Sequence, residues 1–330
     1  MKAAFIHQPG PPESIVFGDL PVPEPAPGQV LVRVRAVAVN PIDTYIRSGM
    51  IPMAVPSPYV VGCDLAGVVE ATGSGSARFK VGDRVWCSNQ GLMGRQGTFA
   101  EFAAVDEPWL HPIPGSVGDE HAAAIALVGI TAHLGLVGRA NVRPGEVLFV
   151  VGGTGGVGST VVQMAKALGA RVLTTAGSEE NAEAARRLGA DHVVNYKTQD
   201  LAAELKKLAP EGVNVWWETR RQPDFEMAVP LLSKRARFIV MAGREAKPVL
   251  PVGPFYVKDC SLFGFAMFNA SPEEQRPAAE AINTWLAGGQ LKPRIDRVLP
   301  LSGAAEAHRL QEDNTLHHAG TLAGKIVLKP

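Results

Sequence analysis

The chain has 330 residues, 46% of them hydrophobic, and its 32 Lys and Arg residues are balanced by 32 Asp and Glu residues. This length suits two domains, each of which can bury a hydrophobic core of its own. A formal net charge of zero and an aromatic content of 6% argue against nucleic acid as a main partner.

The three cysteines, Cys63, Cys87 and Cys260, lie far apart and form no C-x-x-C motif. Their odd number and spacing argue against a disulfide scaffold or a structural zinc site, and they fit a reducing cytosol. The segment Met1–His7 is too short and interrupted for a signal peptide, and no run of about eighteen apolar residues occurs. We therefore expect a cytosolic protein that does not span a membrane.

The first 120 residues are predicted to form short strands separated by glycine and proline turns. The strands are expected at residues 3–6, 29–39, within 60–71, after a turn at 81–85, and at 97–105. Closely spaced strands with this punctuation are typical of a compact, barrel-like β domain.

Near residue 119 the pattern changes to a helical segment at 120–137, and from residue 147 strands and helices alternate. Strands are predicted at 147–151, 171–175, 192–195, 213–217 and 236–241, and helices at 159–168, 181–188, 201–208 and 225–232. This alternation is typical of a doubly wound parallel sheet.

After about residue 259 the pattern changes again. A helix is predicted at 272–288, a strand at 295–299, a helix at 304–311 and a closing strand at 325–328. We expect this tail to return to the first domain, so that the parallel-sheet domain is an insertion between two parts of the first.

A glycine motif lies at the centre of the second domain. Gly153, Gly155 and Gly158 satisfy G-x-G-x-x-G between the strand at 147–151 and the helix at 159–168. In such a motif the first glycine permits a tight turn, the second lets the backbone approach a pyrophosphate, and the third lets helix and strand pack closely. A mere connecting loop is the alternative, but the strand–turn–helix context favours a dinucleotide site. The expected cofactor contacts here are Gly153, Thr154, Gly155, Gly156 and Val157.

Five stretches carry a family resemblance: 40–49 (NPIDTYIRSG), 61–67 (VGCDLAG), 81–85 (VGDRV), 152–158 with Gln163 and Lys166, and 320–328 (GTLAGKIVL). They resemble the zinc-free medium-chain dehydrogenases/reductases, most closely the NADPH:quinone oxidoreductases of the zeta-crystallin type, over nearly the whole chain. The resemblance implies an α/β fold with a GroES-like β-rich catalytic domain at 1–122 and 269–330. It also implies a Rossmann domain at 123–268, with nicotinamide and substrate bound in a cleft between the two domains.

The positions of the zinc ligands are occupied by other residues. Zinc-dependent relatives carry Cys where this chain has Asn40, His-Glu where it has Cys63-Asp64, and four cysteines near residues 86–100, where this chain has one. A zinc site needs about three or four nitrogen or sulfur ligands. We therefore predict no metal. Without a Lewis acid to stabilise an alkoxide, hydride delivery to a quinone or an activated enone is favoured over alcohol oxidation.

Tyr45, Asn40 and Thr131 are the candidate catalytic residues. The resemblance places Tyr45 in the cleft, where its phenol would hydrogen-bond an acceptor carbonyl or donate a proton; an ordinary core tyrosine is the alternative. Asn40 either bonds the acceptor oxygen or the cofactor, or is a turn residue before Pro41. Thr131 resembles the family threonine near the nicotinamide, or its hydroxyl bonds its own helix backbone. Asp43 is predicted to cap a helix that begins there.

Cofactor preference depends on the end of the second Rossmann strand, which has no acidic residue to bind a ribose 2′-OH. Gly177 and Ser178 can donate to a 2′-phosphate, Tyr196 resembles the family tyrosine of this pocket, and Asn181 replaces a basic residue of some relatives. These features favour NADPH over NADH, although Glu179 and Glu180 follow immediately. Further expected cofactor contacts are Thr219, Gly243, Arg244, Phe265, Ala266, Met267 and Lys325, with a solvated lysine as the alternative for the last.

The sequence thus predicts a zinc-independent oxidoreductase that transfers hydride from NADPH to a quinone. An enoyl or 2-alkenal reductase on the same fold is one alternative, and an NADPH-binding structural or RNA-binding protein is another. The resemblance also suggests a homodimer or homotetramer formed through edge strands of the Rossmann sheet. Residues 216–223 (WWETRRQP) depart from the family and leave the acceptor open. His317-His318 is interpreted as a loop feature and not as a metal site.

Overall fold

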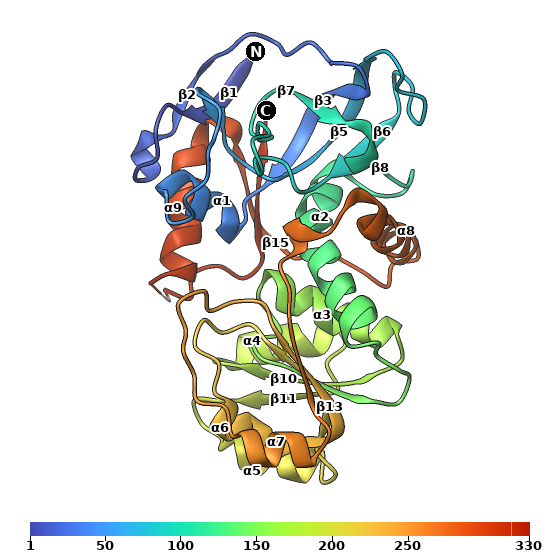
Figure 1. Ribbon diagram of the computed structural model, residues 1–330, viewed down its shortest axis with the longest axis vertical. Coiled ribbons are helices and arrows are strands. Elements are labelled where there is room, and N and C mark those ends of the chain that lie inside the picture. Colours follow the sequence, from blue (N-terminus) through green and yellow to red (C-terminus); the bar gives the residue numbers. More distant parts are fainter. Residues whose placement is uncertain (318) are drawn as a thin grey trace. The chain divides into compact units, whose positions relative to one another are not determined.

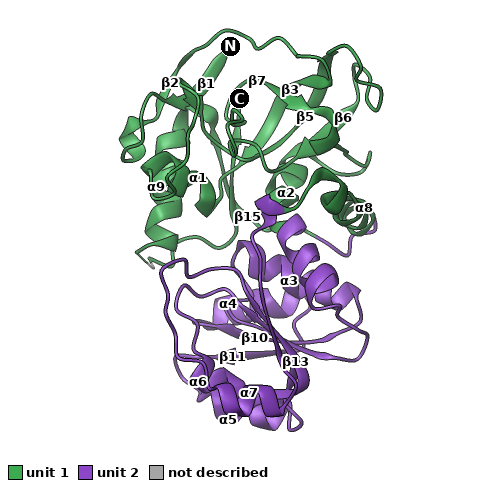
Figure 2. Cartoon of the chain, in the orientation of Figure 1, with its two compact units in different colours: residues 1–128, 270–287, 292–330 green, residues 129–269, 288–291 purple. Residues whose placement is uncertain are grey.

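The computed structural model describes residues 1–317 and 319–330, so half of the predicted His317-His318 feature lies outside the described residues. The chain divides into two compact units, shown in Figure 2. Unit 1 comprises residues 1–128, 270–287 and 292–330, and unit 2 comprises residues 129–269 and 288–291. The α/β class, with one β-rich unit and one parallel-sheet unit, is confirmed.

Unit 1 is built on two sheets whose neighbouring strands are mostly antiparallel. The smaller sheet has the order β2-β1-β4, and the larger has the order β15-β16-β3-β5-β6-β8, with β7 also paired to β3. In β3, buried Val32 and Val34 alternate with exposed Arg33 and Arg35, as a half-buried strand requires. The strands are β1 (Lys2–Ile6), β2 (Val16–Asp19), β3 (Gln29–Ala38), β4 (Tyr59–Val60), β5 (Asp64–Thr72), β6 (Arg84–Cys87), β7 (Phe102–Asp106), β8 (His111–Pro112), β15 (Ile295–Pro300) and β16 (Lys325–Lys329).

Helix α1 (Pro41–Ser48) lies within the stretch 40–49, one of those that carry the family resemblance. Asn40 is its N-cap and Gly49, in the left-handed conformation, is its C-cap. The prediction that Asp43 caps a helix beginning there is wrong by three positions. Asp43 is instead the third helical residue, and its Oδ2 accepts from the backbone N–H of Asn40 at 2.8 Å. Unit 1 also contains α8 (Pro272–Ala287), α9 (Ala304–Thr315) and the 3₁₀ turns Pro12–Ser14, Glu107–Trp109 and Leu301–Gly303.

Helix α2 (Asp119–His133) continues as a π-helical segment, Leu134–Arg139, and its first half belongs to unit 1. Among the described residues, the combined stretch Asp119–Arg139 is long and apolar enough to cross a membrane, but 72% of its most apolar window is buried within the fold. Burial of this kind is what a core helix shows, so its composition alone carries no membrane assignment.

Unit 2 contains a parallel sheet with the strand order β11-β10-β9-β12-β13-β14. This order is typical of dinucleotide-binding folds, in which successive strands are added first on one side of the first strand, here β9, and then on the other side. The strands are β9 (Val147–Val150), β10 (Arg171–Ala176), β11 (His192–Asn195), β12 (Val213–Glu218), β13 (Leu232–Val240) and β14 (Ser261–Gly264). The helices are α3 (Gly156–Ala167), α4 (Glu179–Arg187), α5 (Leu201–Leu208), α6 (Phe225–Ala228) and α7 (Val252–Val257), with 3₁₀ turns at Val229–Leu231 and Met267–Asn269.

The helices of unit 2 cover both faces of its sheet, with α3 and α4 on one face and α5, α6 and α7 on the other (Figure 1). Adjacent tryptophans of β12 point to opposite faces, as alternation along a strand requires. Trp216 packs among Phe149 and Phe238 on the α5–α7 side. Trp217 contacts Gly135 and Phe265 on the other face. The unusual Trp-Trp pair therefore builds the core of unit 2.

Two histidines are buried in unit 1 without charge compensation. His308 of α9 is 0% exposed, and neither of its ring nitrogens has a hydrogen-bond partner among the described residues. Burial, aided by nearby Arg47, lowers the pKa of His308 to about 3. Burial likewise lowers the pKa of His111 to about 3, with Arg78 contributing.

These histidines are expected to make the protein sensitive to acid. Because an unfolded histidine has a pKa of about 6.5, the unfolded chain binds protons that the folded chain excludes between about pH 6.5 and 3. Above this window the two histidines do not reduce the free energy of unfolding. As the pH decreases, this free energy falls by up to about 2.7 kcal/mol per histidine between about pH 6.5 and 4.5. Urea unfolding of wild type and His308→Phe at both pH values measures this loss. An equal loss in the two proteins would remove His308 from the explanation.

Candidate functional site

The glycine turn of unit 2 joins β9 to α3, as the sequence predicts. Gly155 is the N-cap of α3, and no side chain caps this helix end. The first N–H groups of the helix are therefore available to an anion. A Cβ on Gly155 would meet only Gly152 O, at 3.8 Å, so the space beside it is open. This open cradle fits the pyrophosphate of a dinucleotide.

The individual glycines differ in part from their predicted roles. The positive φ of the turn, +74°, belongs to Gly152 and not to Gly153. Position 153 requires glycine, because a Cβ there would lie 2.3 Å from Thr174 Oγ1. Position 158 also requires glycine, because a Cβ there would lie 2.1 Å from Gly152 O. The turn is also held by threonines that sequence reasoning missed. Thr175 Oγ1 accepts from Gly152 N at 3.0 Å.

The predicted 2′-phosphate residues come together at the carboxyl end of β10. Gly177 follows the strand, and a Cβ on it would lie 2.5 Å from the hydroxyl of Tyr196. Ser178 is the N-cap of α4, and its Oγ accepts from Asn181 N at 3.3 Å. Neutral donors therefore surround this strand end, although Glu179 and Glu180 begin α4.

The carboxyl ends of β12, β13 and β14 hold the remaining predicted contacts of unit 2. Thr219 Oγ1 donates to Val151 O at 2.6 Å, which ties the loop after β12 to the glycine turn. Gly243 lies against the same loop, because a Cβ on it would come within 2.4 Å of Arg221 O. Arg244 is exposed, whereas Phe265 and Ala266 are half-buried and Met267 is buried.

Unit 1 contains a buried polar network centred on Lys325. The ammonium group of Lys325, in a residue only 5% exposed, donates to Val39 O and to Asn40 Oδ1. Asn40 Nδ2 donates to Asp64 Oδ2 at 2.8 Å and to Ala38 O at 3.2 Å. The amide of Asn40, which is 0% exposed, is therefore saturated by internal partners.

Burial strongly shifts the pKa values of the ionisable groups in this network. Burial raises the pKa of Asp64, against the opposing attraction of Lys325 and hydrogen bonds from Ser88 and Asn40. Burial raises the pKa of Asp43 to about 7, opposed by hydrogen bonds from the Cys63 thiol and the Asn40 N–H. Burial lowers the pKa of Lys325, while Asp64 and Asp43 raise it. One buried cation thus faces two buried carboxyl groups.

The three predicted catalytic residues lie in different surroundings. Tyr45 is half-buried on α1 of unit 1, and Thr131 is buried on α2 within unit 2. Asn40 lies at the start of α1, inside the Lys325 network. The predicted role of Lys325 toward the cofactor phosphates stays a prediction, but in this structure its ammonium group is used within unit 1.

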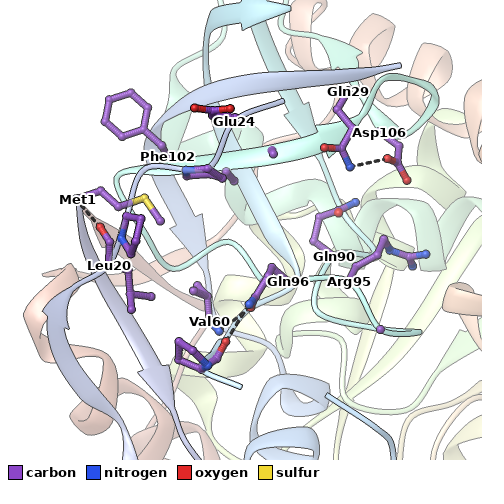
Figure 3. A pocket seen from close by; sticks show the side chains of 17 residues that line it. Met1, Leu20, Glu24, Gln29, Val60, Gln90, Arg95, Gln96, Phe102 and Asp106 are labelled. Carbon is purple, nitrogen blue, oxygen red and sulfur yellow. Dashed lines mark hydrogen bonds between the residues drawn. The ribbon is translucent and has the colours of Figure 1, made fainter. Parts of the chain in front are cut away.

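A cavity of 510 Å³ also lies in unit 1, lined by residues that include Gln29, Gln96 and Asp106 (Figure 3). None of the predicted site residues lines it. Gln29 Nε2 donates to Asp106 Oδ1 at 2.9 Å, and Gln96 bonds the backbone of Pro58 and Val60, so these amides are satisfied internally. We assign no role to this cavity.

The donor set does not fit a zinc ion. Within residues 1–317 and 319–330, no group of three or more His, Cys, Asp or Glu side chains is arranged to hold a metal. At the positions of the zinc ligands in zinc-dependent relatives, the chain presents an amide, a buried thiol and a carboxyl group. The amide oxygen of Asn40 accepts from the ammonium of Lys325, and this buried positive charge also acts on Cys63 and Asp64, so the place is unfavourable for a second cation.

Comparisons with known proteins agree with this architecture. A model of the alcohol dehydrogenase GroES-like domain matches residues 26–115, and one described as zinc-binding dehydrogenase matches residues 156–284. Quinone oxidoreductase of Homo sapiens is 34% identical over 330 residues, covering 99% of this chain and 97% of that protein. The 2-haloacrylate reductase of a Burkholderia species is 32% identical over 322 residues, covering 94% and 95%.

Solved structures extend the likeness over the whole chain. Escherichia coli quinone oxidoreductase complexed with NADPH superposes with a TM-score of 0.87 at 27% identity, covering 100% of both chains. An NAD-dependent alcohol dehydrogenase superposes with a TM-score of 0.88 at 33% identity, also covering 100% of both. With both domain types matched and its relatives aligned end to end, the chain belongs to the zinc-free quinone oxidoreductase family of the medium-chain dehydrogenases/reductases.

Proposed function

We propose that this protein transfers hydride from NADPH to an electrophilic acceptor without a metal ion, and that a quinone is its acceptor. The observation that carries the proposal is the open cradle beside Gly155 at the uncapped start of α3. Backbone donors of the turn would hold the pyrophosphate there. The quinone is favoured because relatives aligned over nearly their whole length are quinone oxidoreductases.

The residues at the carboxyl end of β10 support NADPH over NADH as the cofactor. Gly177 lies beside Tyr196 at this strand end, Ser178 caps the next helix by accepting from Asn181 N, and no acidic residue ends the strand, which supports a pocket for a 2′-phosphate. A solved neighbour also carries NADPH. Comparing steady-state constants with NADPH and NADH tests this preference, and equal specificity constants for the two would refute it.

The chain's own residues would orient the acceptor and supply a proton. Bound NADPH supplies the hydride, and the acceptor takes it together with one proton, so that a quinone leaves as a hydroquinone. Tyr45 is the residue we assign to the acceptor oxygen, where its hydroxyl donates a hydrogen bond as negative charge develops. Asn40 is given a positioning role, because its amide already bonds Lys325 and Asp64.

Optical measurement of NADPH oxidation with a panel of quinones and enones tests the function, and EDTA should not change the rates. Tyr45→Phe is expected to lower turnover about 100-fold or more, because a hydrogen bond to the developing charge is lost. An unchanged rate would remove Tyr45 from the mechanism. If no acceptor is turned over, the oxidoreductase proposal is wrong.

A second candidate is reduction of an activated alkene, supported by the 32% identity to 2-haloacrylate reductase. The two functions differ in the acceptor alone, so the same panel separates them. Tight NADPH binding without any turnover would favour the third possibility, a structural or RNA-binding role.

We further propose a homo-oligomer formed through unit 2. Strand β14 is the edge of the parallel sheet, and exposed apolar side chains occur on β14, on α7 and in the loop before α7. These side chains are Val249 (66% exposed), Val252 (63%), Tyr256 (67%), Val257 (68%) and Leu262 (41%). Antiparallel pairing of β14 with its copy would bury them and satisfy the strand edge. A monomeric sedimentation coefficient at micromolar concentration would rule this out.

We also propose a cytosolic location. Cys63, Cys87 and Cys260 are free, and the first two are buried, so the fold has no disulfide among its described residues. Free thiols of this kind suit a reducing compartment. Fractionation of the source cells tests the location.

A further inference from the structure

Helix α1 has two faces that differ in burial, and Tyr45 lies on the less buried one. The buried residues are Asp43, Thr44, Ile46 and Arg47, and the half-buried ones are Pro41, Ile42, Tyr45 and Ser48. Successive residues of an α-helix are about 100° apart around its axis, so Tyr45 lies almost opposite the midpoint between Asp43 and Arg47. The interior of unit 1 therefore holds one face of α1, and the opposite face carries Tyr45.

Arg47 attaches the buried face of α1 to two other segments of unit 1. Its side chain is 1% exposed, and its Nη1 donates to Gly10 O while its Nη2 donates to Glu312 Oε1. The backbone N–H of Gly10 in turn donates to Arg47 O at 3.0 Å. Glu312 belongs to α9, which packs on α1 (Figure 1). Arg47 thus joins α1 both to α9 and to the segment that follows β1.

This attachment acts on the turn of the helix that contains Tyr45. The carbonyl oxygen of Tyr45 accepts from Ile51 N and from Ser48 Oγ, each at 3.2 Å. At the other end of the helix, Asn40 is fixed by the buried polar network of unit 1. Asn40 and Arg47 are seven residues apart, or about 10 Å along the axis. Two attachments at opposite ends therefore fix both the rotation and the axial position of α1.

Stability alone explains the Arg47–Glu312 ion pair poorly. Arg47 Nε is buried and has no hydrogen-bond partner among the described residues. Burial lowers the pKa of Arg47 more than the charges of Glu312 and Glu13 raise it, so desolvation outweighs their attraction. Apolar side chains of similar volume often stabilise a fold as well as a buried ion pair does, or better. What the guanidinium adds is direction, because its planar fork fixes the geometry of each hydrogen bond.

Resting on the role proposed above for Tyr45 in the oxidoreductase, we propose that Arg47 is a positioning residue that acts on the reaction through Tyr45. Its bonds to Gly10 and Glu312 set the rotation of α1, and the rotation sets where the phenol hydroxyl lies. The hydroxyl is at the tip of a long side chain, so a small rotation of α1 moves it farther than it moves the backbone. A displacement of about 1 Å at a reacting group can lower a rate about 100-fold.

The test is a double-mutant cycle in kcat between Arg47 and Tyr45. Oxidation of NADPH by 1,4-naphthoquinone is measured for wild type, Arg47→Met, Arg47→Lys and Glu312→Gln, each alone and combined with Tyr45→Phe. The matched control is Arg309→Gln, which removes an exposed arginine of α9 that pairs with Glu13. The Kd for NADPH and the thermal unfolding of every protein are measured in parallel. Glu312→Gln leaves Arg47 an acceptor, so it serves as the second variant if Arg47→Met does not fold.

With Tyr45 in place, kcat should fall about tenfold in Arg47→Met and less in Glu312→Gln, and it should be partly restored in Arg47→Lys. The KM for naphthoquinone and the Kd for NADPH should stay within about twofold of wild type, because binding is not what the variants change. Combined with Tyr45→Phe, the same substitutions should change kcat by less than about twofold, since no hydroxyl is left to misplace. Arg309→Gln should keep the wild-type kcat.

Equal losses of kcat with and without the Tyr45 hydroxyl would overturn the proposal, because a general structural role of Arg47 predicts additive effects. An unchanged kcat in Arg47→Met and Glu312→Gln, or a loss confined to KM or to NADPH binding, would also overturn it and leave the oxidoreductase function intact. If Tyr45→Phe alone has the wild-type kcat, the roles of both residues are wrong although NADPH is still oxidised. Absence of turnover with any acceptor overturns the oxidoreductase function as well.

Discussion

Replacing Gly155 by valine is expected to abolish NADPH binding and leave the fold intact. No protein atom lies nearer than 3.8 Å to a Cβ at this position, and φ is −71°, which any residue adopts. The added side chain would occupy the open cradle that the pyrophosphate must enter. We expect the Kd for NADPH to rise at least about 100-fold, or about 2.7 kcal/mol. Fluorescence titration of NADPH and thermal unfolding by circular dichroism measure the two effects.

Gly158→Ala provides the matched comparison within the same turn. A Cβ there would lie 2.1 Å from the carbonyl oxygen of Gly152, a backbone atom that cannot move aside cheaply. This variant should unfold at a lower temperature even without cofactor. If Gly155→Val binds NADPH like wild type, the cradle is not where the pyrophosphate lies.

Lys325→Met is expected to cause a large loss of stability. It removes the one cation of the buried network and leaves Asp64, which is 0% exposed, without its opposite charge. Breaking a buried ion pair by removing one partner costs about 3–5 kcal/mol. Urea unfolding at neutral pH should show a loss of that size in the free energy of unfolding.

The loss of unfolding free energy should be less than additive when the carboxylate of Asp64 is removed together with Lys325. The double variant with Lys325→Met and Asp64→Asn should lose at least about 1 kcal/mol less than the sum of the single losses, because the two groups interact. Lys329→Met is the control on the same strand. Lys329 is 53% exposed in its ion pair with Glu120, so its loss should stay within about 1 kcal/mol. Additive losses in the double variant would show that Lys325 and Asp64 are not coupled.

The parallel sheet and its glycine turn were predictable because their signals are local. Strands β9, β10 and β12 are short apolar runs next to glycines, and their periodicity survives in a single sequence. Strand β14 and helix α7 were not predicted, since both are short and largely exposed and lack that periodicity. The predicted helix at 225–232 is shortened to α6 and a 3₁₀ turn, because β13 already begins at Leu232.

The candidate site was predicted less well, because its contacts join distant parts of the chain. The sequence indicates Asn40 as a residue of chemical interest, but it cannot show that Lys325 and Asp64 saturate its amide. Those partners come from β16 and β5, and only the register between strands brings them to α1. The bond from Thr219 to Val151 is hidden for the same reason.

The pairing of β16 with β3 also has a consequence for synthesis of the protein on the ribosome. The whole of unit 2's sheet is translated between these two strands, and Lys325 meets Asn40 across 285 residues of sequence. Unit 2 can fold as soon as it emerges, whereas the partially made unit 1 must keep an edge of β3 unpaired until β16 arrives. A chain ending at residue 324 should therefore show protease-resistant unit 2 joined to a digestible unit 1.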